Sequence, residues 1–104
     1  MSRYGLTKEV IVKIIDVFAR FQEVDVVLIY GSRAKGNFKN GSDIDLTIKG
    51  EKLNLSLLCL ISNELDELLL PYTFDLSNYD QIDNKSLIEH INREGVVFYQ
   101  KTAA

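Results

Sequence analysis

The feature that most constrains this chain is a short apolar strand that stops at a glycine and leads into a polar loop. Val26–Tyr30 has the β-branched and aromatic composition of a buried strand, and Gly31-Ser32 interrupts it. The following residues, through Lys35, can form a helical turn before Gly36 stops it. A glycine at such a junction lets backbone N–H groups approach an anion closely, and a helix start adds free donors. The segment therefore predicts a loop that binds phosphate groups through Gly31, Ser32, Arg33 and Lys35.

A second strand, predicted for Asp43–Lys49, carries two aspartates on one face. In a strand, residues i and i+2 point the same way, so Asp43 and Asp45 should lie with α-carbons roughly 6.5–7 Å apart. The intervening isoleucine and the later apolar residues take the opposite, buried face. Two neighbouring carboxylates repel one another unless a cation neutralises them, and oxygen ligands suit Mg²⁺. Asp43 and Asp45 are therefore predicted to bind one or two Mg²⁺ ions beside the phosphate loop.

Gly31-Ser32, ten intervening residues and Asp43-Ile44-Asp45 together resemble the signature of the DNA polymerase β superfamily of nucleotidyltransferases. The fuller strings, Gly31 to Gly36 and Gly41 to Leu46, look like those of its small prokaryotic branch, the minimal nucleotidyltransferases (MNT). The resemblance implies an α/β (α+β) fold, a small mixed β-sheet with helices mainly on one face. It also implies Mg²⁺ and ATP as cofactor and nucleotide donor.

The same resemblance implies a third metal-binding acid on the strand after the long second helix. Tyr72–Ser77 is strand-like, and within it Asp75 points away from its apolar neighbours. Asp75 is therefore the best match for the third catalytic carboxylate, the alternative being an exposed strand residue. The role of Arg33 also stays open between offsetting charge on the departing pyrophosphate and a structural place at the surface.

Minimal nucleotidyltransferases of this type are antitoxins encoded beside a helical ribonuclease toxin of the HEPN class. The resemblance implies that this chain transfers AMP from ATP to a tyrosine of such a toxin and forms a hetero-oligomer with it. One alternative keeps the enzyme but has a small molecule or an RNA end as acceptor. Another is a module that neutralises the toxin by binding alone.

The remaining elements follow from hydrophobic periodicity and capping residues. A helix is predicted for residues 7–22, a strand for Asp25–Tyr30, a long helix for Leu53–Leu70, a helix for 85–94 that Asn84 caps and Gly95 ends, and a strand for Val96–Gln100. The core-facing stripe of the long helix is predicted to be Leu58, Ile61, Leu65, Leu68 and Leu69. Its adjoining face, with Leu53, Leu57 and Leu60, is either covered by the last helix or is a protein-binding surface. His90 is expected on a helix surface.

The whole chain, residues 1–104, is expected to form a single domain. Its net charge of −3 argues against a stable grip on nucleic acid, which needs a basic surface. The one cysteine, Cys59, cannot form an internal disulfide and is expected to be buried and inert. The N-terminus does not read as a secretory signal and no apolar run is long enough to span a membrane, so the protein is expected in the cytoplasm.

Overall fold

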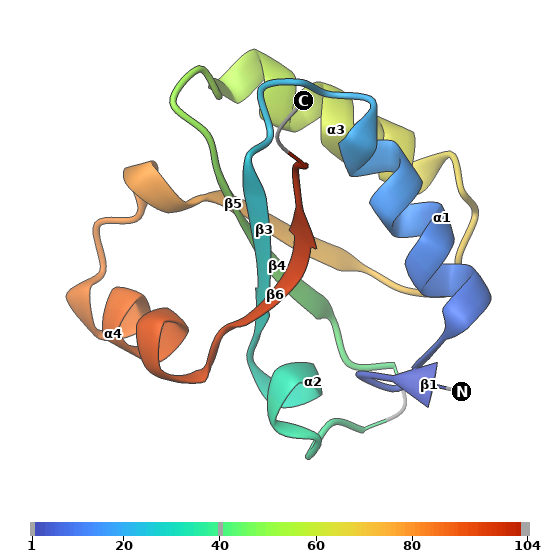
Figure 1. Cartoon of the computed structure of the whole chain (residues 1–104). Coiled ribbons are helices and arrows are strands. Elements are labelled where there is room, and N and C mark those ends of the chain that lie inside the picture. Colours follow the sequence, from blue (N-terminus) through green and yellow to red (C-terminus); the bar gives the residue numbers. More distant parts are fainter. Residues whose placement is uncertain (1, 40, 103–104) are drawn as a thin grey trace.

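A mixed four-stranded sheet forms the centre of the protein (Figure 1), as seen in a computed structural model that describes residues 2–39 and 41–102. Its strands are β3 (Val26–Tyr30), β4 (Ile44–Lys49), β5 (Phe74–Asn78) and β6 (Val96–Gln100), in the order β5-β4-β3-β6. β3 runs antiparallel to β4 and to β6, whereas β4 and β5 are parallel. The parallel pair needs a long crossover, which contains helix α3. The predicted mixed sheet is confirmed.

The helices are α1 (Lys8–Ala19), α2 (Ser32–Lys35), α3 (Leu55–Asp66) and α4 (Lys85–Glu94), with a 3-10 turn, η1 (Tyr79–Gln81), before α4. Thr7 caps α1, because its hydroxyl accepts a hydrogen bond from the Val10 N–H. Asn54 caps α3 and Asn84 caps α4 in the same way. The predicted bounds of the last helix and of the final strand are correct. The predicted α1 and α3 were too long at both ends.

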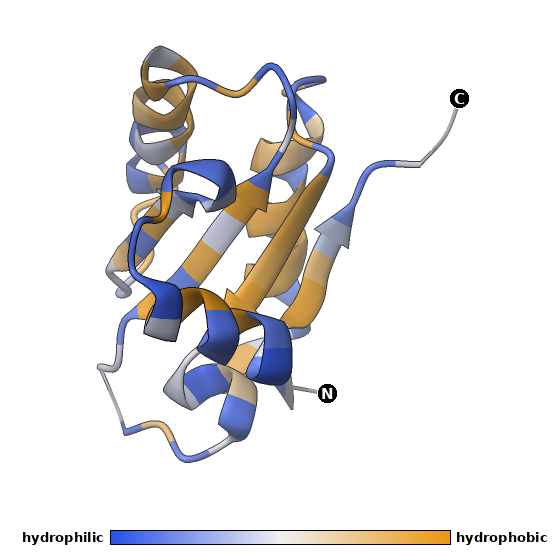
Figure 2. Ribbon diagram, turned by 90° about the vertical axis from the view of Figure 1, so that its left-hand side faces the viewer, coloured by the Kyte–Doolittle hydropathy of each residue, from blue (hydrophilic) through white to orange (hydrophobic). Residues whose placement is uncertain are grey.

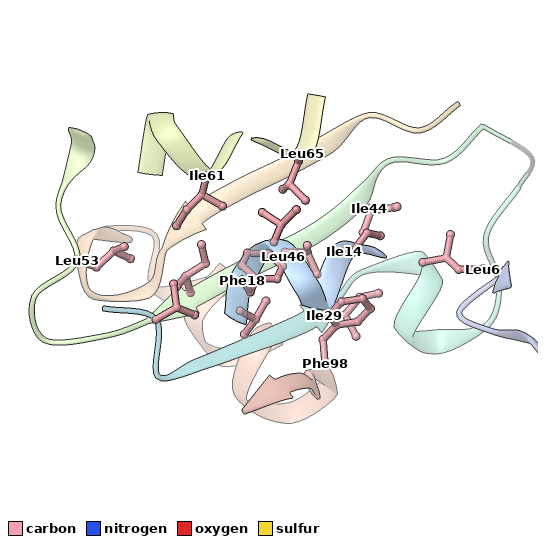
Figure 3. Close-up of a cluster of buried hydrophobic side chains, with 14 residues drawn as sticks. Leu6, Ile14, Phe18, Ile29, Ile44, Leu46, Leu53, Ile61, Leu65 and Phe98 are labelled. Atoms are coloured by element: carbon pink, nitrogen blue, oxygen red, sulfur yellow. The ribbon is translucent and has the colours of Figure 1, made fainter. Parts of the chain in front are cut away.

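The core lies between the sheet and the pair α1 and α3. On β4 the apolar side chains alternate with Asp45 and Thr47, so Ile44, Leu46 and Ile48 are fully buried on one face. Figure 3 shows side chains from the strands and from both helices meeting in one cluster. In Figure 2 the central strands are largely hydrophobic, whereas the helices carry both hydrophobic and hydrophilic residues. The other main members of this core are Leu6, Ile14, Val17, Phe18, Val24, Val27, Ile29, Leu53, Ile61, Leu65 and Phe98.

Two predictions about the long helix are wrong. Leu69 was placed in the core stripe, yet its side chain is 89% exposed. The helix ends at Asp66, and Leu69 follows in a left-handed conformation with φ 54°, which takes it off the helical stripe. Cys59 was expected to be buried, but it is exposed. It lies two residues before the buried Ile61, about 200° around the helix, and therefore faces away from the core.

The prediction that the last helix covers the Leu53, Leu57 and Leu60 face is also wrong. Helix α4 packs on β3 from the side of the sheet opposite to α1 and α3 (Figure 1). The ring of His90 meets the ring of Tyr30 edge-on, with centroids 6.3 Å apart, so His90 is half-buried against the sheet. Leu53 is buried in the main core and Leu57 packs against it, while Leu60 remains 53% exposed.

A small N-terminal hairpin was not predicted. β1 (Ser2–Arg3) and β2 (Leu6–Thr7) pair antiparallel around a turn at Tyr4 and Gly5, both with positive φ. This is the turn chemistry of a two-residue hairpin loop, and it directs Leu6 into the core with no exposed surface. The hairpin matters for the site because the Tyr4 carbonyl accepts a hydrogen bond from the guanidinium of Arg33 in α2. None of the described helices has the length and hydrophobicity needed to cross a lipid bilayer.

Candidate active site

The predicted phosphate loop begins at Gly31, directly after β3. Gly31 precedes α2 with φ 77° and ψ −156°, a backbone conformation that is essentially restricted to glycine. A Cβ atom on Gly31 would overlap the Oδ2 atom of Asp45. The backbone of the Gly-Ser turn therefore lies directly against one of the predicted metal-binding carboxylates. Gly31 and Asp45, fourteen positions apart in the sequence, thus lie side by side.

Two of the three predicted acids are neighbours across the sheet. In the β3–β4 register Tyr30 is the partner of Asp45, and in the β4–β5 register Asp45 is the partner of Asp75. These three residues therefore occupy one row across the face opposite to the core. Asp43 lies one residue before the start of β4, and its side chain is exposed. The structure thus brings Asp45 and Asp75 together, with Asp43 at the entry to the same strand.

The electrostatics of this row are dominated by negative charge. Burial, the neighbouring Asp75 carboxylate and, more weakly, Asp43 raise the pKa of Asp45 above its usual value, while the charge of Arg33 opposes the shift. Burial raises the pKa of the Tyr30 hydroxyl, which a hydroxyl contact from Ser77 opposes and the charges of Asp75 and Asp45 reinforce. Like charges held this close repel one another, so the electrostatics of the row favour a cation as counter-ion.

These carboxylates fit Mg²⁺ in donor type, because that ion prefers oxygen ligands and often takes only one or two carboxylates from the protein. Within residues 2–39 and 41–102, no group of three acidic, histidine or cysteine side chains is close enough to hold a metal ion. Asp45 and Asp75 form the close pair, and Asp43 is carried by the loop that ends at β4. The position of that loop consequently decides whether a third carboxylate can join the pair.

The other predicted phosphate-loop residues divide into surface and interior positions. Ser32, the first residue of α2, is partly exposed, and Lys35 is exposed at its last residue. Arg33 is different, because only 3% of its surface is accessible. Its guanidinium donates hydrogen bonds to the carbonyl oxygens of Ser42 and Tyr4. Of the two roles considered for Arg33, a structural one fits these contacts, although in the interior and not at the surface.

Two residues of this face were not singled out from the sequence. Tyr30 lies next to the acids, 6% exposed, and Ser77 follows Asp75 on the same face of β5. The Ser77 hydroxyl is buried and has no hydrogen-bond partner of good geometry among the described residues. The two-residue spacing from Asp75 could have identified Ser77. Tyr30, in contrast, reads in the sequence as one more apolar strand residue.

A comparison with known protein families agrees with the resemblance that the sequence motifs showed. The family described as polymerase beta, nucleotidyltransferase matches residues 12–104, nearly the whole chain. The chain belongs to the polymerase beta nucleotidyltransferase family. Gly31-Ser32 and Asp43-Ile44-Asp45, the motif that resembled this superfamily, lie within the matched region. No functionally curated protein matches the chain.

Several solved structures share this nucleotidyltransferase fold. A toxin–antitoxin crystal structure with AMP-PNP superimposes with a TM-score of 0.72 at 18% identity, covering 88% of this chain and 73% of the other. The toxin–antitoxin MntA-HepT gives 0.68 at 15% identity, with 91% and 74% covered. A tri-AMPylated Shewanella oneidensis HEPN toxin in complex with an MNT antitoxin gives 0.66 at 16% identity, with 90% and 72% covered. At these identities the likeness establishes the common fold.

Proposed function

We propose that this protein is a Mg²⁺-dependent nucleotidyltransferase that transfers AMP from ATP to a hydroxyl acceptor. The observation that carries the proposal is the row across the sheet in which Asp45 lies beside Asp75 while the Gly31 backbone abuts the Asp45 carboxylate. A phosphate-binding turn in contact with paired carboxylates is the arrangement that nucleotidyl transfer needs, because the donor's phosphates and the metal ligands must meet. Membership of the polymerase beta family supports the same reaction class.

In this proposal each residue has a distinct role. Asp43, Asp45 and Asp75 hold Mg²⁺, which when bound supplies positive charge to the reacting phosphate group. Main-chain N–H groups of the Gly31-Ser32 turn and the Ser32 hydroxyl bind the outer phosphates of ATP, and Lys35 offsets charge on the departing pyrophosphate. Asp75, exposed on β5, is also placed to accept the proton of the attacking hydroxyl.

We further propose that the acceptor is a tyrosine of a HEPN-class toxin that forms a hetero-oligomer with this chain. Support comes from the fold shared with chains of toxin–antitoxin complexes, one of which contains an AMPylated HEPN toxin. The described residues form one small sheet with its helices, and a partner protein would present its own acceptor hydroxyl to the acidic row on this sheet.

The test combines the purified protein, Mg²⁺ and ATP with the product of the neighbouring reading frame, which we propose as the HEPN-class partner. We expect mass spectrometry to find AMP on a tyrosine of the partner, and to find none with an Asp43→Ala/Asp45→Ala double variant that still folds and still binds the partner. Neutralisation of the toxin by that double variant would support a module that acts by binding alone. AMP found on a small molecule or an RNA end, with none on the partner, would replace the acceptor but keep the reaction.

A further inference from the structure

We propose that Arg33 is a positioning residue, which fastens the loop between α2 and β4 and thereby sets the position of Asp43 relative to the pair Asp45 and Asp75. This inference rests on the proposed function for its catalytic meaning. The contacts that carry it do not depend on metal or nucleotide. They involve a buried guanidinium, two backbone carbonyls and two aromatic rings.

The hydrogen bonds of Arg33 converge on the residue immediately before Asp43. Its Nε and Nη2 atoms both donate to the Ser42 carbonyl oxygen, at 3.1 and 2.8 Å. Its Nη1 atom donates to the Tyr4 carbonyl oxygen at 3.0 Å. All three guanidinium nitrogens are therefore used on backbone atoms. The carbonyl of Ser42 is fixed by two bonds at once, and the peptide that leads into Asp43 is fixed with it.

Aromatic rings complete the enclosure of the guanidinium. The Arg33 Cζ atom lies 5.1 Å from the ring centroid of Phe38 and 5.0 Å from that of Tyr72, both within cation–π range. Phe38 belongs to the same loop as Ser42, and Tyr72 lies two residues before β5, the strand that carries Asp75. Arg33 thus joins the phosphate loop, the Asp43 loop and the approach to Asp75.

The loop has few other restraints near Asp43. β4 begins only at Ile44, so Asp43 lies outside the strand pairing. Ser42 donates its N–H to the Lys39 carbonyl at 3.0 Å, and its hydroxyl accepts from the Lys39 N–H at 2.9 Å. Those bonds are internal to the loop, so they shape it without attaching it to the rest of the protein. The described contacts that attach the Ser42 end to other elements come from Arg33 and, after Asp43, from the Ile44 N–H to Thr73.

The burial of the Arg33 charge costs free energy of folding. Among the described residues, no carboxylate lies within ion-pair distance of Arg33, whereas Arg20 pairs with Asp16 and Glu64 at the surface. A buried charge without a counter-ion costs free energy that neutral acceptors and ring faces offset only in part. An apolar side chain would fill the same space at lower cost. The planar fork of arginine is what the Ser42 and Tyr4 carbonyls require, and lysine cannot reproduce it.

The experiment compares Arg33→Lys, which keeps the charge but loses the fork, with Arg33→Met, which keeps only the stem. Arg20→Lys, at an exposed ion pair, is the matched control. Amide hydrogen exchange in the metal-free protein measures how firmly the loop is held, and Mn²⁺ titration measures the metal affinity of the site. For both Arg33 variants we expect exchange of the Ser42 amide to accelerate at least about tenfold, with Leu46 and Val27 unchanged. We expect Mn²⁺ affinity to fall about 10–100-fold, as when a supporting group of a metal site is lost. Arg20→Lys should match the wild type in both.

The outcomes separate this inference from the proposed function. Unchanged exchange of the Ser42 amide in folded Arg33→Lys protein would overturn the positioning role. The role would also be overturned if Arg33→Lys bound Mn²⁺ like the wild type and only Arg33→Met lost affinity, because the positive charge alone would then explain the effect. A wild-type protein that bound no Mn²⁺ would count against the proposed function, while the exchange result would still decide whether Arg33 holds the loop. Should Arg33→Lys fail to fold, Tyr72→Leu removes one ring face and should shift exchange and affinity in the same direction by less.

Discussion

Replacing Gly31 by alanine separates the chemistry of the site from the stability of the fold. The φ and ψ of Gly31, 77° and −156°, fall in a region essentially restricted to glycine, so alanine there costs about 1–3 kcal/mol of strain. The new Cβ atom would also overlap Oδ2 of Asp45, so this carboxylate must move. A displacement of about 1 Å in a catalytic group can lower a rate about 10²-fold. We therefore expect Gly31→Ala to lower the rate of AMP transfer by much more than its loss of folding stability would explain.

Gly36 offers a matched control at the other end of α2. It also has positive φ, 84°, but a Cβ atom there would meet no other atom within 4 Å. Gly36→Ala should therefore lose about 1–2 kcal/mol from the left-handed backbone alone. Urea denaturation measures both stabilities, and Mn²⁺ titration together with AMP transfer measures the site. Wild-type metal affinity and transfer in Gly31→Ala, or an equal loss of both in Gly36→Ala, would refute the contact between the turn and Asp45.

Two further predictions concern charge and packing. Because the folded-state pKa of Asp45 is raised, the folded protein should lose stability as pH rises through that pKa, and Asp45→Asn should remove the loss. Thermal denaturation without divalent metal should then give a higher Tm for Asp45→Asn than for the wild type at about pH 7. The difference in Tm should shrink toward about pH 3.5, where a free aspartate is largely protonated. Equal Tm values of the two proteins at both pH values would contradict this prediction. Ile61→Ala, in the core, should lower the free energy of unfolding by about 2–5 kcal/mol, whereas Leu69→Ala, at an exposed turn, should change it by no more than about 0.5 kcal/mol. Chemical denaturation measures both variants, and a large loss from Leu69→Ala would mean that this leucine is buried after all.

The central unit of the fold could be predicted because its signals are local. Alternation on β4 placed Ile44, Leu46 and Ile48 in the core and Asp45 on the other face. The strand before Gly31 and the capped helix at Asn84 were readable for the same reason. Local periodicity, turn residues and caps act over a few positions, so one sequence is enough to recognise them.

Contacts between distant segments could not be predicted in the same way. The pairing of Asp45 with Asp75 depends on the register of a parallel pair whose partners are joined through α3, and hydrophobic alternation does not determine that register alone. The family resemblance, rather than spacing, selected Asp75. The place of α4 on the opposite face was missed because its apolar stripe does not specify which surface it covers.

Arg33 and Leu69 illustrate two ways in which a local pattern misleads. A basic residue beside a phosphate loop reads as a phosphate ligand, yet its hydrogen bonds go to the carbonyls of Ser42 and Tyr4. The second carbonyl belongs to a hairpin of two-residue strands, which is too short to produce a periodic signal. Leu69 continues a helical stripe in the sequence, but the helix has already ended at Asp66. In each case a tertiary contact or a backbone turn overrode the pattern.

The origin of the transferred phosphorus tests the central claim most directly. The wild-type protein is incubated with Mg²⁺, the HEPN-class partner and ATP labelled at either the α- or the γ-phosphate. If Asp43, Asp45 and Asp75 support attack on the α-phosphorus, α-label should appear on the partner and γ-label should leave with pyrophosphate. Label from γ-ATP on the partner would mean phosphoryl transfer and would contradict the account, as would α-label that persists in the folded Asp43→Ala/Asp45→Ala variant.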